Sequence, residues 1–285
     1  MSFQDTPTFK LKELERILLS MQRIVVAFSG GVDSTFLLYA AHKWLESNAI
    51  AVTIATPYIP KWEINEATAF TKEFGIRHSI IELDFPPFLR DNPEDRCYQC
   101  KSFLFQKLRQ FAEDENAILT DGTNHDDTGD YRPGLRALTE LKVRSPLLEA
   151  KLGKNDIREL SRDWGLSTWD KPAYACLMTR VPFGTTISDG ELRQIEQAET
   201  ALMELGFRAV RVRHHGNLAR IELPQQEIIK ATEMRREITA CLQQAGYRFV
   251  TIDLNGYAMG SFNPTPKSPH NSQNHTVRIQ ELELV

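Results

Sequence analysis

Residues 23–41 read RIVVAFSGGVDSTFLLYAA, which is a buried strand, a glycine-containing turn and an apolar helix in direct succession. RIVVAF has the length and β-branched content of a buried strand, and the residues after the turn place apolar side chains at helical spacing. Two glycines let the turn be tight and bring its backbone N–H groups close to an anion. The following helix adds its positive N-terminal end. This stretch therefore predicts an anion site at the end of a strand.

The same alternation of strands and helices continues beyond this stretch. AIAVTIAT, RHSIIELD and NAILTDGT are typical of strands, and EINEATAFTKEFG and CYQCKSFLFQKLRQFAED are typical of helices. Strands separated by helices of this length imply right-handed crossovers and a parallel sheet with helices on both faces. The predicted fold class is therefore α/β, with a doubly wound, Rossmann-like parallel sheet over residues 1–170.

The pattern changes after residue 170. Residues 171–188 are punctuated by Pro, Gly and Thr, and we interpret them as a long loop, which is more often functional than idle in a compact protein. Residues 189–263 predict a small α+β domain: a helix, two strands around a GN turn, a helix over 224–245 and a last strand. Residues 264–285 are rich in Pro, Ser and Asn, and we expect a mobile tail there.

The bulk composition excludes several classes of protein. Of 285 residues 41% are hydrophobic, which is enough for a packed core. The net charge of −4 gives no basic bias of the kind that general nucleic-acid binders have. The first residues lack a signal-peptide pattern, and the apolar runs are too short to span a bilayer. We therefore expect a cytoplasmic protein that binds neither nucleic acid nor membrane.

The turn SGGVDST, residues 29–35, offers more than backbone amides. Its hydroxyl groups are further donors, and Asp33 could hold magnesium or cap the helix. No Gly-Lys-Ser/Thr follows, so this is not a Walker A loop. A second turn, DGTNHDD, ends a later strand, and parallel strands bring their carboxyl ends to one edge. An ordinary turn is the alternative for both. The candidate nucleotide site comprises Ser29, Gly30, Gly31, Asp33, Ser34, Thr123, Asn124 and Asp127.

Three of the four cysteines form the most informative pattern in the chain. Cys97 and Cys100 lie three positions apart in the predicted first turn of a helix, where N-terminal amides favour thiolates. Cys176 lies in the long loop, and Cys241 has core spacing. A redox dithiol, a zinc site completed by a histidine, and a 4Fe–4S cluster with one open iron all remain possible from the residues alone.

Arginines provide candidate phosphate binders. In AVRVRHHG the alternation of a strand places Arg211, Arg213 and His215 on one face, and two adjacent arginines can grip a phosphate through paired N–H donors. A solvated sheet face is the ordinary alternative. Arg180 and Lys101 are weaker candidates for steadying phosphates.

These motifs resemble those of known enzymes. SGGVDS resembles the pyrophosphate loop of the PP-loop ATP pyrophosphatases, which cleave ATP to AMP and pyrophosphate to adenylate a substrate oxygen. From about residue 10 to 263 the chain resembles one branch of them, the LarE family of ATP-dependent sulfur transferases. The segments that carry this resemblance are DRCYQCK, DGTNHDDTGDYRPGLRAL, RSPLLEAKLGKNDIRELSRDWGLSTWDKPAYACLMTRVPFGT, VRVRHHGNLARIE and GYRFVTIDLNGYAMGSFN.

The resemblance implies an activity. Its substrate would be pyridinium-3,5-biscarboxylic acid mononucleotide, whose carboxylates are adenylated and then converted to thiocarboxylates with ATP and Mg²⁺. The product leads to the nickel-pincer nucleotide of lactate racemase. Arg211 and Arg213 would bind the substrate's phosphate. The implied partners are the enzymes that make the substrate, a downstream nickel insertase and further copies of the chain as a homo-oligomer.

The family resemblance also bears on the cysteines. In one kind of member a lone cysteine at the position of Cys176 gives up its sulfur and becomes dehydroalanine. The other kind has an added Cys-x-x-Cys, present here, and is expected to hold a 4Fe–4S cluster through Cys97, Cys100 and Cys176 that delivers sulfide catalytically. Sacrifice of Cys176 remains an alternative. Two further alternatives remain: a PP-loop tRNA thiolase, which the net negative charge of the chain disfavours, and a nucleotide-binding redox or zinc protein.

Overall fold

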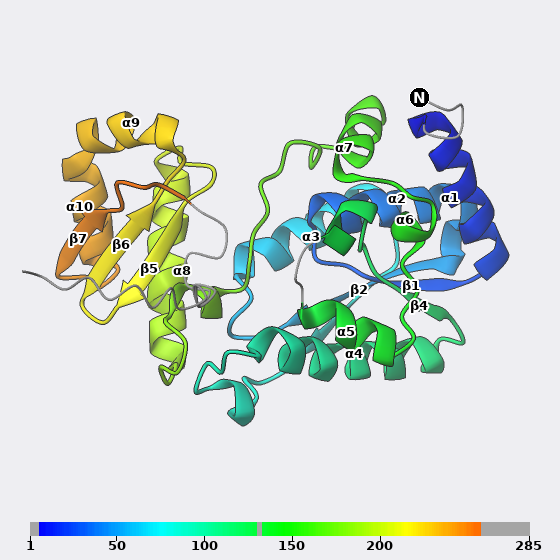
Figure 1. The fold of residues 1–285 in the computed structure, drawn as a ribbon, viewed down its shortest axis with the longest axis horizontal. Coiled ribbons are helices and arrows are strands. Elements are labelled where there is room, and N and C mark those ends of the chain that lie inside the picture. Colours follow the sequence, from blue (N-terminus) through cyan, green and yellow to red (C-terminus); the bar gives the residue numbers. More distant parts are fainter. Residues whose placement is uncertain (1–5, 130–132, 258–285) are drawn as a thin grey trace, which may run out of the picture.

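The computed structural model describes residues 6–129 and 133–257. Its larger part is a sheet of four parallel strands, in the order β3-β2-β1-β4, with helices on both faces (Figure 1). The expected doubly wound α/β fold is therefore confirmed. The strands are β1 (Ile24–Ala27), β2 (Ala49–Ala55), β3 (His78–Glu82) and β4 (Ile118–Thr120).

Two apolar layers hold the helices against this sheet. On one face the side chains of β1 pack with those of α1, α2, α3 and α7, and Trp44 and Trp164 pack against this layer. On the other face α4 and α5 cover β1 and β2. The helices are α1 (Pro7–Met21), α2 (Val32–Leu45), α3 (Lys61–Glu73), α4 (Arg96–Asp114), α5 (Pro133–Glu140), α6 (Pro146–Glu149) and α7 (Lys154–Asp163).

The order of the strands fixes where a ligand can bind. The chain runs outward from β1 to β2 and β3, and then returns to the other side of β1 with β4. Loops that follow β1 and β4 therefore diverge at the carboxyl edge of the sheet, which is the switch point where α/β sheets bind ligands. The SGGVDST turn over residues 29–35, called here the phosphate loop, follows β1. The turn over residues 121–124, called here the DGTN turn, follows β4.

A second, smaller unit comprises residues 189–257, called here the C-terminal unit. Its sheet has the order β5-β6-β7, with β5 and β6 antiparallel and β6 and β7 parallel. The expected helix over 224–245 is interrupted at Met234, where ψ is 22°, and forms α9 and α10 instead. Cys241 packs against this core as expected. The elements are α8 (Asp189–Glu204), β5 (Arg211–His215), β6 (Leu218–Glu222), α9 (Ile228–Glu233), α10 (Arg235–Gln244) and β7 (Phe249–Ile252).

A further apolar cluster joins the two units through the loop over residues 171–188. Side chains of the loop, among them Leu177, Met178 and Val181, pack with Tyr58 of the α/β unit and with α8. Within the loop, residues Leu177–Arg180 form a short 3₁₀ turn, labelled η5. The expected tail over 264–285 lies outside the described residues, and the domain boundaries at residues 170 and 188 stay a proposal.

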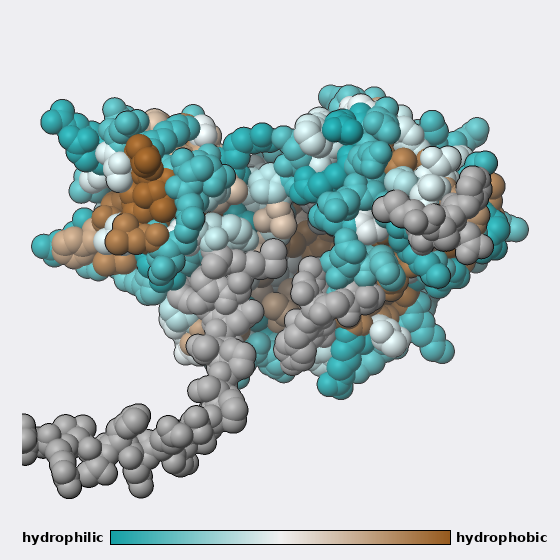
Figure 2. Space-filling view, turned by 45° about the horizontal axis from the view of Figure 1, so that its top comes forward, coloured by the Kyte–Doolittle hydropathy of each residue, from teal (hydrophilic) through white to brown (hydrophobic). Residues whose placement is uncertain are grey.

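The described surface has two further features. No helix of the described residues is long and apolar enough to cross a membrane. Figure 2 shows hydrophobic surface gathered on the C-terminal unit, whose exposed large apolar side chains include Ile229, Phe249 and Leu254. Apolar patches of this kind are typical of contact surfaces.

Candidate functional site

The phosphate loop is a tight turn pressed against a neighbouring helix. Gly30 has φ of +68°, and a Cβ added there would lie 3.3 Å from Cβ of Ala67 on α3, so both its conformation and its surroundings favour glycine. Gly31 caps α2, and the hydroxyl groups of Ser29 and Ser34 lie 3.1 Å apart. The loop therefore presents two hydroxyl groups beside the first amides of α2, which is an arrangement suited to phosphate.

The DGTN turn packs directly on this loop. A Cβ added to Gly122 would lie 2.8 Å from the backbone nitrogen of Ser34, so glycine is needed for the close approach. Carboxylate side chains hold the turn: Oγ1 of Thr123 donates to Asp121 (2.5 Å), and the backbone N–H of Asn124 donates to Asp127 (3.0 Å). The structure thus brings the two halves of the predicted nucleotide site together.

Asp33 has a partner that the sequence did not indicate. Its carboxylate accepts a hydrogen bond from Nζ of Lys154 at the start of α7 (2.5 Å). Burial raises the pKa of Asp33 above its ordinary value, opposed by the charge of Lys154, and Asp127 raises it further. Magnesium in nucleotide sites usually keeps only one or two protein carboxylates together with phosphate oxygens. Asp33 lies in the first turn of α2, beside the phosphate loop.

A crevice of about 250 Å³ opens beside the loop at the carboxyl edge of the sheet. Its wall is mostly apolar and comes from β1, β2, α3 and α4, and Ser29 and Cys176 both line it. A flat heteroaromatic base suits such a wall, since ligand sites combine apolar surface with a few polar groups. The same crevice therefore offers room for a nucleotide base and exposes a sulfur atom beside the phosphate loop.

Three arginines hold the backbone around Cys176. Arg180 donates to the carbonyl oxygens of Ala175 (2.7 Å) and Cys176 (3.3 Å) and forms a bidentate pair with Glu199 of α8, with both N–O distances 2.8 Å. The Arg180 and Glu199 side chains are only 1% and 3% exposed. Arg180, expected as a weaker phosphate candidate, is thus engaged within the protein.

The two arginines of β5 complete this clamp. Arg211 donates to the carbonyl oxygen of Ala173 (2.5 Å), and Arg213 donates to that of Thr179 (2.7 Å) and to Glu222 (2.6 Å). They are 2% and 5% exposed, so they do not lie on a solvated sheet face. Both guanidinium groups lie against the loop that carries Cys176.

Cys97, Cys100 and Cys176 lie within electrostatic reach of one another. The Cys97 side chain is exposed, while Cys100 and Cys176 are partly buried beside the apolar cluster around Tyr58. Burial, and to a smaller extent the charge of Cys176, raises the pKa of Cys100 to about 12. Burial, followed by the charge of Cys97, also raises the pKa of Cys176. The expected stabilisation of thiolates by helix amides is therefore outweighed by desolvation at Cys100.

Comparison with known proteins supports the same interpretation of the site. Residues 6–59 match the PP-loop domain model. The chain is 39% identical over 260 residues to an uncharacterized protein of Synechocystis, which covers 89% of this chain and 97% of that one. It is 36% identical over 260 residues to pyridinium-3,5-bisthiocarboxylic acid mononucleotide synthase of Lactiplantibacillus plantarum, covering 90% of this chain and 94% of that enzyme. The chain belongs to the LarE family.

LarE family members are ATP-dependent sulfur transferases, and the phosphate loop beside a cysteine-lined crevice is consistent with that chemistry. A third relative, an uncharacterized protein of Methanocaldococcus jannaschii, is 34% identical over 249 residues and covers 87% of this chain and 96% of its own length. The resemblance inferred from the motifs is therefore confirmed over most of the chain.

Glu63 is a residue of this LarE-family site that sequence reasoning missed. It lies in the first turn of α3 and lines the crevice with Ser29 and Cys176. Burial raises the pKa of Glu63 to about 7, although the charges of Lys171, Arg180 and Arg211 oppose the rise. In the sequence EINEATAF this glutamate is indistinguishable from its solvated neighbours, so only the fold reveals it.

Replacing Glu63 by Gln is expected to stabilise the protein at neutral pH. The pKa of Glu63 rises from 4.5 to about 7 on folding, so the folded chain binds a proton more tightly than the unfolded chain. The free energy of unfolding therefore falls as the pH rises from about 4.5 to 7. The Glu63→Gln variant lacks this loss. We therefore expect its free energy of unfolding at pH 8 to exceed that of the parent by up to about 3 kcal/mol.

Urea unfolding at pH 4.5 and at pH 8 measures this effect. The gain should appear at pH 8 and be much smaller at pH 4.5. Glu73→Gln, an exposed glutamate on the same helix, is the matched control and should change little at either pH. Equal changes for Glu63→Gln at both pH values would contradict a titrating, buried carboxyl group.

Proposed function

We propose that this chain adenylates the carboxylates of pyridinium-3,5-biscarboxylic acid mononucleotide with ATP and converts them to thiocarboxylates, in the biosynthesis of the nickel-pincer nucleotide. The observation that carries the proposal is the crevice that joins Ser29 of the phosphate loop to Cys176. Adenylation turns a poor leaving oxygen into AMP, and a sulfur nucleophile must then reach the same carbon. The relative whose name states this product is similar over nearly its whole length.

Different residues of the site bind the different parts of ATP. The phosphate loop, with Ser29, Ser34 and the first amides of α2, binds the phosphates of ATP. Asp33 would hold magnesium, which would supply positive charge beside the phosphates, and the amides of the loop offset the charge that develops on departing pyrophosphate. The DGTN turn supports the loop from β4 through Thr123, Asn124 and Asp127. The apolar wall of the crevice takes the adenine base.

Arg211 and Arg213 are proposed to bind the phosphate of the mononucleotide. Their guanidinium groups lie on the C-terminal unit beside the Cys176 loop, and the phosphate would share donors that now bond to Ala173, Thr179 and Glu222. Binding the substrate there keeps its ring near Cys176. The same contacts to Ala173 and Thr179 fix the position of the loop, so the two arginines orient the sulfur and the substrate together.

We interpret the three cysteines as ligands of a 4Fe–4S cluster and not of a single metal ion. Among residues 6–129 and 133–257, no three His, Cys, Asp or Glu side chains form a group that could hold one metal ion. In a cubane cluster each thiolate binds a different iron, so its cysteines surround a volume instead of converging on a point. The charges of Cys97 and Cys176 raise the pKa of Cys100, and the cations of Arg96 and Arg180 oppose the rise in the pKa of Cys176 that burial causes, which suits an anionic cluster.

Cys97, Cys100 and Cys176 would hold this cluster. When bound, it would supply an open iron that carries sulfide for transfer. We further propose that the enzyme acts in the cytoplasm as a homo-oligomer, between the enzymes that supply the mononucleotide and a nickel insertase that consumes the product. The exposed apolar side chains of the C-terminal unit are candidates for the contact between copies.

One experiment tests both the reaction and the cluster. Protein purified without oxygen is assayed for iron and acid-labile sulfide, and then given ATP, magnesium, sulfide and the mononucleotide, with the product followed by mass spectrometry. We expect about four irons per chain and many thiocarboxylates per chain. Cys97→Ala should lose the iron, whereas Cys241→Ala in the C-terminal core should keep it.

The same experiment weighs sacrificial use of Cys176, which its position in the crevice also allows. In that case at most one sulfur per chain is transferred, and the peptide that contains Cys176 loses about 34 Da as H₂S. Zinc or no metal in a folded chain that still cleaves ATP would overturn the cluster. Failure to form any thiocarboxylate from the mononucleotide, with activity on tRNA instead, would overturn the proposed substrate.

A further inference from the structure

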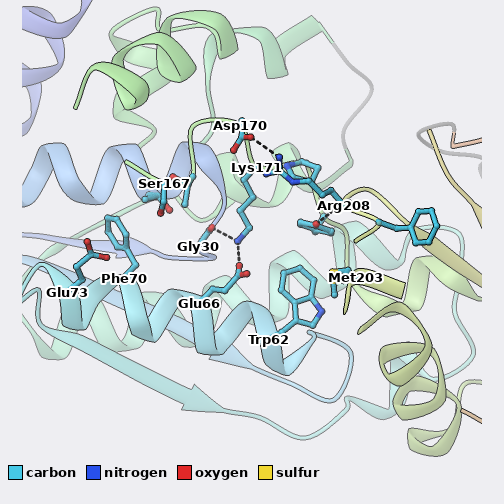
Figure 3. Close-up of a pocket in the computed structure, with 15 residues that line it drawn as sticks. Gly30, Trp62, Glu66, Phe70, Glu73, Ser167, Asp170, Lys171, Met203 and Arg208 are labelled. Atoms are coloured by element: carbon cyan, nitrogen blue, oxygen red, sulfur yellow. Dashed lines mark hydrogen bonds and ion pairs between the residues drawn. The ribbon is translucent and has the colours of Figure 1, made fainter. Parts of the chain in front are cut away.

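The ammonium group of Lys171 lies against the phosphate loop. Its Nζ donates to the carbonyl oxygen of Gly30 (2.8 Å) and to Glu66 of α3 (2.6 Å), as the dashed lines in Figure 3 show. The Lys171 side chain is only 14% exposed, while that of Glu66 is 54% exposed. A largely buried ammonium therefore reaches from the segment that precedes Cys176 to the centre of the anion site.

This ammonium lies on the wall of a second cavity. The cavity has a volume of about 390 Å³ and extends from Gly30 and Thr35, at the start of α2, to α3 and to Phe207 and Arg208 of the C-terminal unit. It is separate from the apolar crevice, in which Ser29 and Cys176 take part. The apolar crevice, proposed to take the base, thus lies on one side of the phosphate loop, and the cavity lined by Lys171 lies on the other.

If Lys171 served only to fix the loop over residues 171–188 to α3, the ion pair with Glu66 would be sufficient. The additional contact with Gly30 places positive charge beside a loop whose amides and helix N-terminus already favour an anion. Glu66 is a single, exposed carboxylate, whereas the terminal phosphates of ATP carry more negative charge. An ammonium in reach of both will favour the phosphates when they arrive.

We propose that Lys171 binds the terminal phosphates of ATP and the departing pyrophosphate, and that Glu66 holds the ammonium only until the nucleotide arrives. This role rests on the proposed function of the phosphate loop. In the step, the substrate carboxylate oxygen bonds to the α-phosphorus while the bond from that phosphorus to the bridging oxygen breaks. The electron pair leaves on pyrophosphate, Lys171 keeps its protons, and its charge stabilises that developing anion.

Inorganic pyrophosphate is the probe that tests this role directly. Its dissociation constant is measured by calorimetry in the presence of magnesium, alongside the rate of ATP cleavage. We expect Lys171→Met to weaken pyrophosphate binding by about tenfold or more, as loss of a charged hydrogen bond does, and Lys171→Arg to fall between. Lys72→Met, which removes an exposed lysine from α3, is the charge-matched control and should bind as the parent does.

Glu66→Gln separates the phosphate role from a structural tie. If Lys171 binds pyrophosphate, this variant frees the ammonium and binds pyrophosphate as tightly as the parent or more tightly. If the ion pair only fixes the loop over residues 171–188, Glu66→Gln and Lys171→Met weaken binding alike, and that result overturns the proposal. Parent-like binding by a folded Lys171→Met chain also overturns it.

Two controls keep the interpretation clear. If Lys171→Met does not fold, Glu66→Gln and Lys171→Arg still decide between the two roles. The binding measurement needs no sulfur acceptor. A wrong mononucleotide would therefore leave the pyrophosphate result intact, and the two failures are distinguishable.

Discussion

Replacing Cys176 by Ala is expected to abolish sulfur transfer while leaving adenylation largely intact. Cys176 is the cysteine that lines the crevice beside Ser29, so its removal takes away the thiolate that would hold the sulfur-carrying cluster where the activated carboxylate must lie. The phosphate loop and the DGTN turn do not contact Cys176 through any described hydrogen bond, and their geometry should persist. Exchange of labelled pyrophosphate into ATP, measured with the mononucleotide, reports adenylation, and mass spectrometry reports the thiocarboxylate.

Cys241→Ala is the matched control for this variant. Cys241 packs against the core of the C-terminal unit, and its replacement should retain both adenylation and sulfur transfer. Thiocarboxylate formation by Cys176→Ala at a substantial fraction of the parent rate would refute a direct role for this cysteine. Loss of exchange in the same variant would instead place Cys176 in the ATP site.

Replacing Glu199 by Ala is expected to destabilise the protein by about 3–5 kcal/mol, because it leaves the buried charge of Arg180 without its partner. The carboxylate also accepts a hydrogen bond from the backbone N–H of Val212 in β5 (2.8 Å), so a second buried donor loses its acceptor. Loss of this size should lower the melting temperature by roughly 10 °C. Differential scanning calorimetry or urea unfolding measures it.

Two further variants sharpen this prediction. Glu204→Ala removes an exposed carboxylate from the same helix and should leave the melting temperature nearly unchanged. The double variant Glu199→Ala, Arg180→Met removes the unpaired cation as well, so it should recover part of the loss. A double variant as unstable as the sum of the two single changes would argue against a coupled pair.

The nucleotide half of the site could be predicted because local patterns determine it. A buried strand followed by SGGVDS gives the phosphate loop directly, and the carboxyl ends of parallel strands must share one edge. The strand order adds what the sequence could not, namely that β4 is the immediate neighbour of β1. This is why the DGTN turn packs on the loop and not elsewhere along that edge.

The other residues of the site depend on contacts between distant segments. Lys154 reaches Asp33 across 121 positions, and Lys171 reaches Gly30 across 141. Neither lysine belongs to a motif, and Glu63 has the helical spacing of a solvated residue. At Cys100 the local argument from helix amides favoured a thiolate, but burial against the cluster around Tyr58 has the larger effect on its pKa. Burial is a property of the fold, so no local pattern predicts it.

The arginine clamp around Cys176 has a consequence for how freely this loop can change. Arg180, Arg211 and Arg213 donate to the backbone carbonyl oxygens of residues 173, 175, 176 and 179, and Arg180 donates in addition to the hydroxyl group of Thr179. The carbonyl is common to all amino acids, so these hydrogen bonds do not require a particular side chain at position 176, although the charge of Arg180 favours an anionic sulfur there. The hydrogen bonds that set the path of the loop therefore do not depend on the side chain at position 176, so a substitution there should leave the chain in place.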